Sequence, residues 1–132
     1  MTTMLSRIVH VTINRPWREV YAFASDPAKM PLWAAGLASG LTQDGEDWIA
    51  SGPLGGARVK FTAANALGVI DHVVTLPNGL RVFNALRVTP NGDGAEVAFT
   101  LLRQAAMSDE EFQRDADAVL ADLETLKRIL EE

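Results

Sequence analysis

The sequence passes from a strand-rich middle into one long helical pattern, and this change limits the architectures open to the chain. Over residues 48–104, short alternating segments are separated by turn signals such as Pro77-Asn78-Gly79. Over residues 109–130, apolar side chains recur at helical spacing instead. A sheet with one apolar face and one helix to cover it predicts a curved sheet wrapped around that helix, an arrangement that tends to enclose a pocket.

The helical segment carries clear signals at both ends. Ser108 followed by Glu111 is a capping box, in which each side chain bonds the backbone amide of the other residue. Acidic residues fill the first turn, and Lys127 and Arg128 lie in the last, as the helix dipole favours. At about 1.5 Å per residue the helix spans roughly 33 Å, enough to cross a small domain. One apolar face is formed by Phe112, Ala116, Val119, Leu120, Leu123, Leu126 and Leu130.

The N-terminal part predicts one strand followed by two short helices. Residues 7–14 alternate between a more apolar and a more polar face, which is typical of a strand. Pro16 suits the first turn of a helix, and Asp26-Pro27 repeats the start signal for a short helix over residues 30–35, which Pro31 weakens. With the strands that follow, the whole pattern predicts an α+β helix-grip fold. Its antiparallel sheet of about six to seven strands would wrap around the long C-terminal helix, in one domain over residues 1–132.

Composition limits the setting in which the chain works. Its 132 residues are 48% apolar and 22% charged, as in a soluble globular domain. No stretch of 18 apolar residues and no basic start followed by an apolar run occur, so we expect neither a membrane span nor a secretory signal. The chain has no cysteine, which excludes disulfides, thiol nucleophiles and thiolate metal sites and favours a cytoplasmic location.

Charge is distributed unevenly along the chain. Residues 109–132 hold nine acidic against three basic residues, a net charge of −6, so the rest of the chain is near +1. There is no basic stripe for a phosphate backbone, and nucleic acid is therefore not an expected partner. We interpret the acidic helix positions as a solvated face.

Several motifs along the chain resemble those of a known superfamily. They are residues 13–21, Asp26-Pro27, Pro31-Leu32-Trp33, residues 71–75, Arg87-Val88, residues 91–99, Arg103-Gln104 and residues 108–112. On these motifs, which cover nearly the whole chain, the sequence resembles the START-like (SRPBCC) superfamily, in a bacterial, polyketide cyclase/dehydrase-like branch. The resemblance implies the helix-grip fold. It leaves the activity open, because such families include carriers, cyclases and protein-binding modules.

His72 is the first candidate for a functional residue. Strand alternation places it with Ile70, Val74 and Leu76 on a face that is otherwise wholly apolar, and Asn84 is placed alike on the next strand. A buried polar group without a partner costs about 1–3 kcal/mol, so both side chains need a protein partner, a water or a ligand. His72 could orient a ligand or act as an acid or base. The alternative is a core histidine satisfied by a neighbouring group.

The remaining candidates are aromatic, sulfur-containing or basic residues near the expected interior. Tryptophans suit a pocket entrance, flexible thioethers adapt to varied ligands, and Arg103, on the face of Phe99, could pair with an anion at the cavity mouth. Plain core packing is the alternative for the apolar residues, and a solvent-reaching side chain is the alternative for Arg103. With His72 and Asn84, the predicted ligand-binding residues are Trp33, Trp48, Phe61, Phe99, Arg103 and Met107.

Three functions remain open on the sequence. The first is binding of a small hydrophobic molecule, lipid or polyketide-like, between the sheet and the last helix. The second is a cyclase or dehydratase that uses His72 as acid and base, with Asn84 or Arg103 steadying an enolate. The third is a protein-interaction module with a filled interior. With two histidines, of which His10 lies on an outer face, we expect no metal site, and no cofactor is indicated. The oligomeric state is not predicted.

Overall fold

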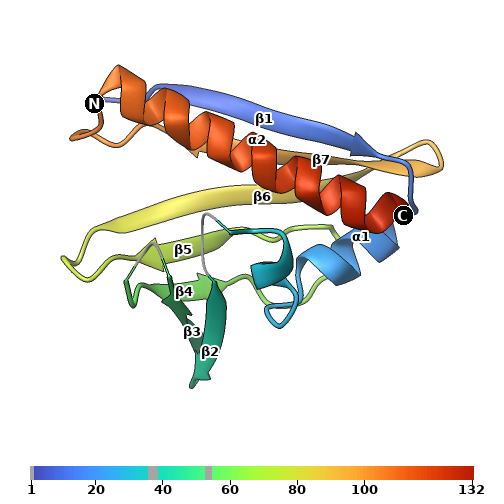
Figure 1. The fold of residues 1–132 in the computed structure, drawn as a ribbon, viewed down its shortest axis with the longest axis horizontal. Coiled ribbons are helices and arrows are strands. Elements are labelled where there is room, and N and C mark those ends of the chain that lie inside the picture. Colours follow the sequence, from blue (N-terminus) through green and yellow to red (C-terminus); the bar gives the residue numbers. More distant parts are fainter. Residues whose placement is uncertain (1, 36–38, 53–54) are drawn as a thin grey trace.

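The computed structural model describes residues 2–35, 39–52 and 55–132, and in this part of the chain seven antiparallel strands form one sheet (Figure 1). Along the sheet the strands are ordered β1-β7-β6-β5-β4-β3-β2. Two α-helices and one 3-10 helix complete the fold, which confirms the predicted helix-grip architecture. The strands are β1 (Ser6–Ile13), β2 (Gly40–Asp44), β3 (Asp47–Ser51), β4 (Arg58–Phe61), β5 (His72–Thr75), β6 (Arg81–Asn91) and β7 (Gly94–Leu102). The helices are α1 (Trp17–Ala24), η1 (Met30–Leu32) and α2 (Asp109–Glu131).

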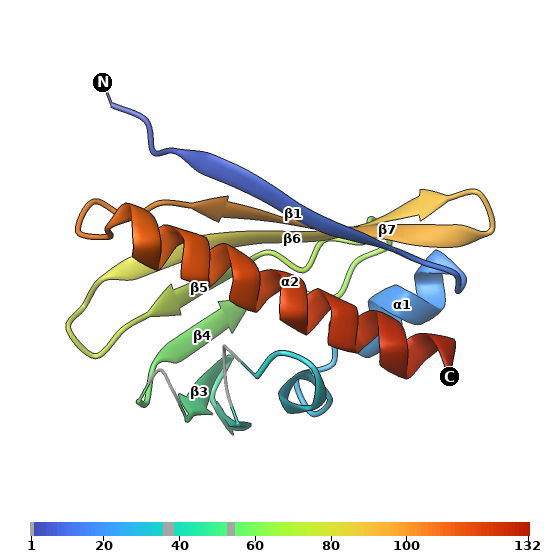
Figure 2. The same ribbon diagram turned by 45° about the horizontal axis from the view of Figure 1, so that its top comes forward.

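Helix α2 lies along the sheet, on the side toward which β2, β3 and β4 curl (Figures 1 and 2). Its start is fixed by the predicted capping box. The Ser108 side chain accepts from the Glu111 backbone N–H at 3.1 Å, and the Glu111 carboxylate accepts from the Ser108 N–H at 3.1 Å. The apolar stripe of the helix faces the sheet, and Leu123 and Leu126 are completely or almost completely buried. The predicted apolar face is therefore the face that packs the helix against the sheet.

The main hydrophobic core lies where α1, the C-terminal half of α2 and the long strands meet. Ile13, Val20 and Val97 are fully buried there, together with Leu126. The proline at position 16 precedes α1, as expected of a residue whose fixed φ suits a helix start. The C-terminal half of α2 is thus packed in the main core, and a smaller cluster that includes Phe112 and Ala116 packs its N-terminal half.

Three details differ from the expectations. The second helix, expected over residues 30–35, is only the 3-10 turn Met30–Leu32, with Pro31 in its first turn. A strand, β2, occupies residues 40–44, which lie before the strand-rich region expected over residues 48–104. The alternating pattern of Ile70 to Leu76 predicts a longer strand than β5, which begins at residue 72. Shortly before it, Gly68 has a positive φ of 77° and leaves the extended conformation.

The loop before β5 is organised by Asn65. Its side-chain oxygen accepts from the backbone N–H groups of Leu67 at 2.9 Å and Val69 at 3.1 Å. The backbone N–H of Val88 donates to the carbonyl of Gly68 at 2.8 Å, so the loop is tied to β6. This fixed loop sets where β5 starts and therefore which side chains of β5 face α2. Among the described residues, no helix is both long and apolar enough to cross a membrane.

Candidate functional site

A cavity of about 430 Å³ lies between the sheet and α2. The sheet supplies an apolar wall that includes Val74, Val82, Phe99 and Leu101. Val74 lies opposite Val82 in the register of β5 and β6, which places both side chains on the same face. A volume of this size lies within the range of small-molecule sites, about 300–1,000 Å³. The interior is therefore hollow at this place, with mainly apolar side chains around it.

His72 stands in the apolar wall of this cavity. The residue is 6% exposed, and its ring lies 5.5 Å from the Phe61 ring, centroid to centroid. Its Nδ1 lies 3.0 Å from the backbone carbonyl oxygen of Ile70. Because a carbonyl can only accept, Nδ1 carries the proton and Nε2 has a free lone pair when the imidazole is neutral. Burial lowers the pKa of His72, against the opposing effects of the Ile70 carbonyl and Asp71, so the neutral ring is favoured.

Asn84 lies beside His72, as their paired positions in β5 and β6 require. Its amide Nδ2 is 3.4 Å from His72 Nε2, a long contact for a hydrogen bond. The amide group can donate to the imidazole lone pair, and its oxygen remains an acceptor. His72 and Asn84 together form a small polar patch in an apolar wall, which is the composition expected of a site that orients a ligand.

Asp71 lies on the opposite side of the sheet from His72, as strand alternation predicts. Its carboxylate accepts from the backbone N–H of Leu86 at 3.0 Å and from Arg87 Nη2 at 2.9 Å. Neither contact involves the imidazole of His72. Asp71 therefore fixes the junction of β5 and β6, and the orientation of His72 comes from the Ile70 carbonyl.

Trp33 and Met30 close the cavity from the side of η1. Trp33 is 4% exposed and Met30 is 2% exposed, and both belong to the lining. The indole Nε1 of Trp33 is buried and has no hydrogen-bond partner among the described residues. A buried donor of this kind is uncommon in a folded protein, and this one lies in the cavity wall, where a ligand or a water molecule can accept from it.

The helix wall of the cavity carries three carboxylates, those of Glu111, Asp115 and Asp122, which we call the acidic rim. The sequence-based interpretation assigned them to a solvated helix face. Their neighbours Val119 and Leu123 line the cavity as well, so the rim is the border between the apolar and the polar face of α2. Spacings of four and seven residues place the three acids near one line along the helix, and this spacing was the signal available in the sequence.

The rim carboxylates have different electrostatic surroundings. The Ser108 backbone and side chain lower the pKa of Glu111. The pKa of Asp115 is raised, first by burial and then by the neighbouring charge of Glu111, with Arg114 opposing. Asp115 thus lies where a second negative charge is unfavourable and a positive one would be favourable.

The structure brings together five of the eight residues predicted to bind a ligand. Trp33, His72, Asn84, Phe99 and Met107 all line the cavity, and Met107 lies near the start of α2. The lining also includes side chains that the sequence analysis did not select: Leu76, Leu80, Val82, Gln104 and the acidic rim. Strand alternation had placed Leu76 on the face of His72, whereas Leu80, next to the turn of the β5–β6 hairpin, had not been assigned to that face.

The other three predicted residues do not line the cavity. Trp48 shares the register of Val59 in β3 and β4, near the far edge of the sheet. Phe61 lies against the ring of His72 and supports it. Arg103 is directed to the start of α2, where its Nε donates to the Met107 carbonyl at 3.0 Å and its Nη1 pairs with Asp109. The carboxylate of Asp109 and the Met107 carbonyl thus hold the guanidinium away from the cavity mouth.

Among the described residues, no group of three or more His, Cys, Asp or Glu side chains is arranged to hold a metal ion. His10, the other histidine, lies on the outer face of β1. Its Nδ1 is 2.7 Å from the carboxylate of Glu96.

Comparison with known proteins gives matches in structure but not in sequence. No family model and no curated protein matches the chain. The structure of XoxI from Bacillus cereus is similar with a TM-score of 0.78 at 12% identity, covering 98% of this chain and 97% of that protein. DynU16, from the dynemicin biosynthetic locus, gives 0.74 at 14% identity, covering 96% of this chain and 47% of its own. Ara h 8.0201 gives 0.67 at 11% identity, with coverage of 97% and 98%. At such identities the similarity establishes a shared helix-grip fold and leaves the activity open.

Proposed function

We propose that the protein binds a small hydrophobic molecule, lipid or polyketide-like, in the cavity between the sheet and α2. The observation that carries the proposal is a hollow of about 430 Å³ whose mainly apolar wall contains the buried His72 and, beside it, the half-buried Asn84. A folded protein normally fills its interior, because empty space loses packing energy. A hollow with a few placed polar groups is the usual form of a small-molecule site.

The fold and the sequence motifs support this proposal. We assign the chain to the START-like superfamily on its motifs, and its structural neighbours have the same helix-grip fold. One of these neighbours belongs to a biosynthetic locus, in line with a small organic ligand. The lack of cysteine agrees with activity in the cytoplasm. The hollow counts against the alternative of an interaction module with a filled interior.

Thermal unfolding with a panel of lipids and aromatic polyketides tests the proposal. A ligand at about 100 times its dissociation constant stabilises the folded state by roughly 2.7 kcal/mol, which for a domain of this size raises Tm by several degrees. The variant Ala118→Trp places a large side chain in the helix wall of the cavity and should abolish the shift. Ala121→Trp is the matched control, since Ala121 is exposed on the same helix and is not part of the lining. Equal shifts in both variants, or none in the native protein, would reject the proposal.

A second candidate is catalysis on such a ligand, favoured by the position of His72 Nε2. A neutral imidazole whose Nδ1 proton is bound by the Ile70 carbonyl presents Nε2 as a base. It could remove a proton next to a ligand carbonyl while Asn84 donates to the oxygen that becomes negative. Arg103 cannot share this role, because it is bound to Asp109 and Met107. On an aromatic polyketide substrate, His72→Ala should abolish turnover and retain the fold; unchanged turnover would eliminate this mechanism.

A further inference from the structure

We propose that the ligand of this cavity carries a carbonyl-type oxygen that accepts a hydrogen bond from the indole N–H of Trp33. This inference rests on the proposed function and specifies its ligand class, which is an oxygenated molecule such as a ketone or an ester, as opposed to a plain hydrocarbon. The indole Nε1 is buried and has no hydrogen-bond partner among the described residues, although Trp33 lines the cavity. Trp33 is then the residue that selects for the ligand oxygen.

Four side chains in the described lining carry nitrogen, and three of them have a polar contact within the protein. His72 Nδ1 and Gln104 Nε2 each lie near a backbone carbonyl oxygen, at 3.0 Å and 3.2 Å. Asn84 Nδ2 lies 3.4 Å from His72 Nε2. The indole nitrogen of Trp33 is the one without such a contact in the part of the chain that the structure describes. An oxygen that enters the cavity therefore finds its most available donor at Trp33.

The indole ring is held in the cavity wall by its packing and by the backbone. Trp33 is 4% exposed and belongs to the main hydrophobic core together with Met30 and Ala34. Its backbone N–H donates to the Met30 carbonyl at 3.1 Å, which closes the 3-10 turn η1. The ring cannot turn its N–H to bulk solvent without leaving this core. The acceptor for Nε1 therefore comes from inside the cavity, as a ligand or a water molecule.

The chemistry of the indole group determines which ligands it favours. An indole N–H can only donate, so no rearrangement of protons satisfies it. A buried donor without an acceptor loses the hydrogen bond that it makes with water in the unfolded chain, and a ligand oxygen restores that bond. A hydrocarbon of the same shape leaves the donor unpaired or displaces a water molecule that had accepted from it. Relative to a cavity without this donor, the site therefore favours the oxygenated molecule.

Two probes of nearly equal shape test the inference: 2-acetonaphthone and 2-isopropenylnaphthalene, in which a methylene group replaces the ketone oxygen. In NMR spectra of the isotope-labelled full chain, the indole N–H signals of the three tryptophans report on the bond directly. The Trp33 indole proton should lie further downfield with the ketone than with the hydrocarbon, because only the ketone accepts from it. The ring-current effect of the shared aromatic group is the same for both probes. Trp17 and Trp48, which are not in the described lining, serve as internal references.

Two single variants measure what the bond contributes to selectivity. Trp33→Phe removes the indole N–H and keeps an aromatic ring in the wall. In this variant the ratio of the dissociation constants of the two probes should move against the ketone by about three-fold to ten-fold, because only the ketone loses a hydrogen bond. Differences in the hydration of the free probes are the same for every variant and cancel in this comparison. Trp48→Phe is the matched control outside the described lining and should leave the ratio unchanged.

Each outcome separates the inference from the proposed function. If the Trp33 indole proton has the same position with both probes, or if the ratio is unchanged in Trp33→Phe, the inference is wrong while the binding function stands. If both variants change the ratio alike, the effect does not come from the cavity wall and the assignment to Trp33 is wrong. Should Trp33→Phe fail to fold, the indole signals of the native chain decide alone. If neither probe gives saturable binding, the proposed function fails, and the inference fails with it.

Discussion

The neighbouring residues Asp71 and His72 point to opposite sides of the sheet and have different roles. Asp71 accepts a hydrogen bond from the backbone of β6, and His72 lines the cavity. His72 faces the cavity, and Asp71 faces the opposite side of the sheet, where it is 8% exposed. The backbone N–H of Leu86 depends on the Asp71 carboxylate for its hydrogen bond. Strand alternation predicted the opposite orientations, but it could not identify the backbone amide as the partner, because that contact joins residues 15 positions apart.

Replacing Asp71 by alanine should lower the free energy of unfolding by about 1–3 kcal/mol, because the buried N–H of Leu86 loses its acceptor. Arg87→Ala removes only the exposed partner of the same ion pair and should cost clearly less than the Asp71 substitution. Urea unfolding at pH 7 measures both values. If the arginine variant were the more damaging, the ion pair and not the backbone contact would be the stabilising element.

The lowered pKa of His72 predicts a dependence of stability on pH. In the folded state the imidazole releases its proton more readily than in the unfolded state, where the pKa is about 6.5. Between the two values the unfolded state binds more protons, so the free energy of unfolding falls as pH drops below about 6.5. Unfolding of the native chain and of His72→Gln, compared from pH 8 to pH 5, should show this extra loss in the native chain alone. Parallel curves would contradict a buried neutral His72.

At the scale of elements, α2 is held over the sheet by residues on one stripe. Leu126 is completely buried in the main core, whereas Leu120, on the same helix, is 38% exposed. Both were predicted on one apolar face, and the structure divides them because the wide apolar stripe exceeds the width of the contact with the sheet. The helix thus depends on a narrower set of positions than its pattern indicates.

Leu126→Ala should reduce the free energy of unfolding by about 2–5 kcal/mol, since it leaves a cavity in a packed core. Leu120→Ala is the matched control on the same helix and should cost well under that amount, because its side chain is partly in water. Chemical denaturation of the two variants makes the comparison. Similar losses of unfolding free energy in the two variants would mean that α2 does not pack on the sheet through the Leu126 side.

Gly68 determines where β5 begins. Its φ is 77°, and a Cβ atom at this position would lie 2.1 Å from the backbone oxygen of Val88. Gly68→Ala should therefore destabilise the fold strongly and disturb the β5–β6 pairing. Gly79 also has a positive φ, of 89°, but a Cβ atom there meets nothing within 4 Å. Gly79→Ala should therefore show the smaller cost of the backbone conformation alone; equal melting temperatures for the two variants would exclude the steric explanation.

For the molecule as a whole, the sequence predicted the helices and strands better than it predicted the cavity between the sheet and α2. The capping box at Ser108 and the alternation in residues 58–61 and 72–75 depend on local physics, and the structure has α2, β4 and β5 there. Whether side chains fill the interior depends on sheet curvature and on the seating of α2, which involve contacts distant in sequence. The same reason explains Arg103, which alternation placed on the face of Phe99: it lies just after β7 and pairs with Asp109, a partner outside the strand.

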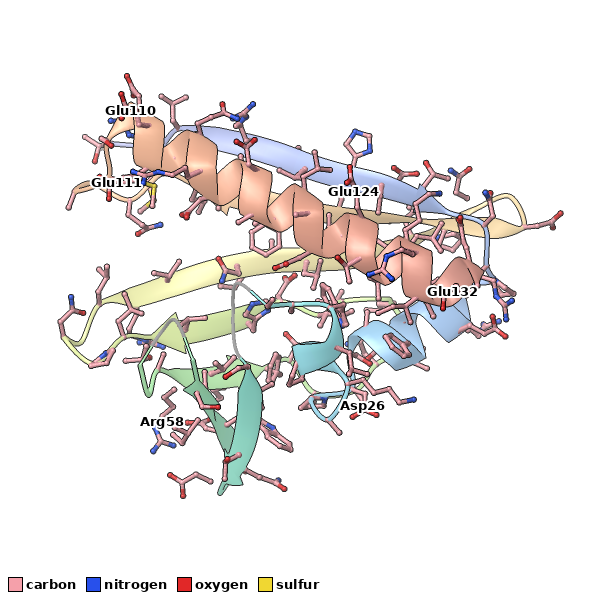
Figure 3. All side chains as sticks on the ribbon, viewed as in Figure 1. Asp26, Arg58, Glu110, Glu111, Glu124 and Glu132 are labelled. Carbon is pink, nitrogen blue, oxygen red and sulfur yellow. The ribbon has the colours of Figure 1, made fainter. Side chains whose placement is uncertain are left out.

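The acidic rim also shows where prediction from the sequence is limited. The acids of α2 were interpreted as solvated, and most of them are exposed. Glu111 lies near the N-terminal end of the helix, as labelled in Figure 3, and it both caps the helix and lines the cavity. A residue at the border between the polar and the apolar face of a helix can point to solvent or to the interior. The position of the sheet relative to the helix decides which of the two it contacts.

The proposed binding function depends on a cavity between the sheet and α2 that accepts a ligand. Amide NMR spectra recorded during titration with 2-naphthylmethanol, a neutral bicyclic aromatic alcohol, test this claim most directly. We predict saturable shifts concentrated at lining residues, including His72, Val82, Phe99 and Val119, with little change at the outer strand β2. Shifts that fail to saturate, or that are confined to the outer surface while the lining residues stay unchanged, would contradict it.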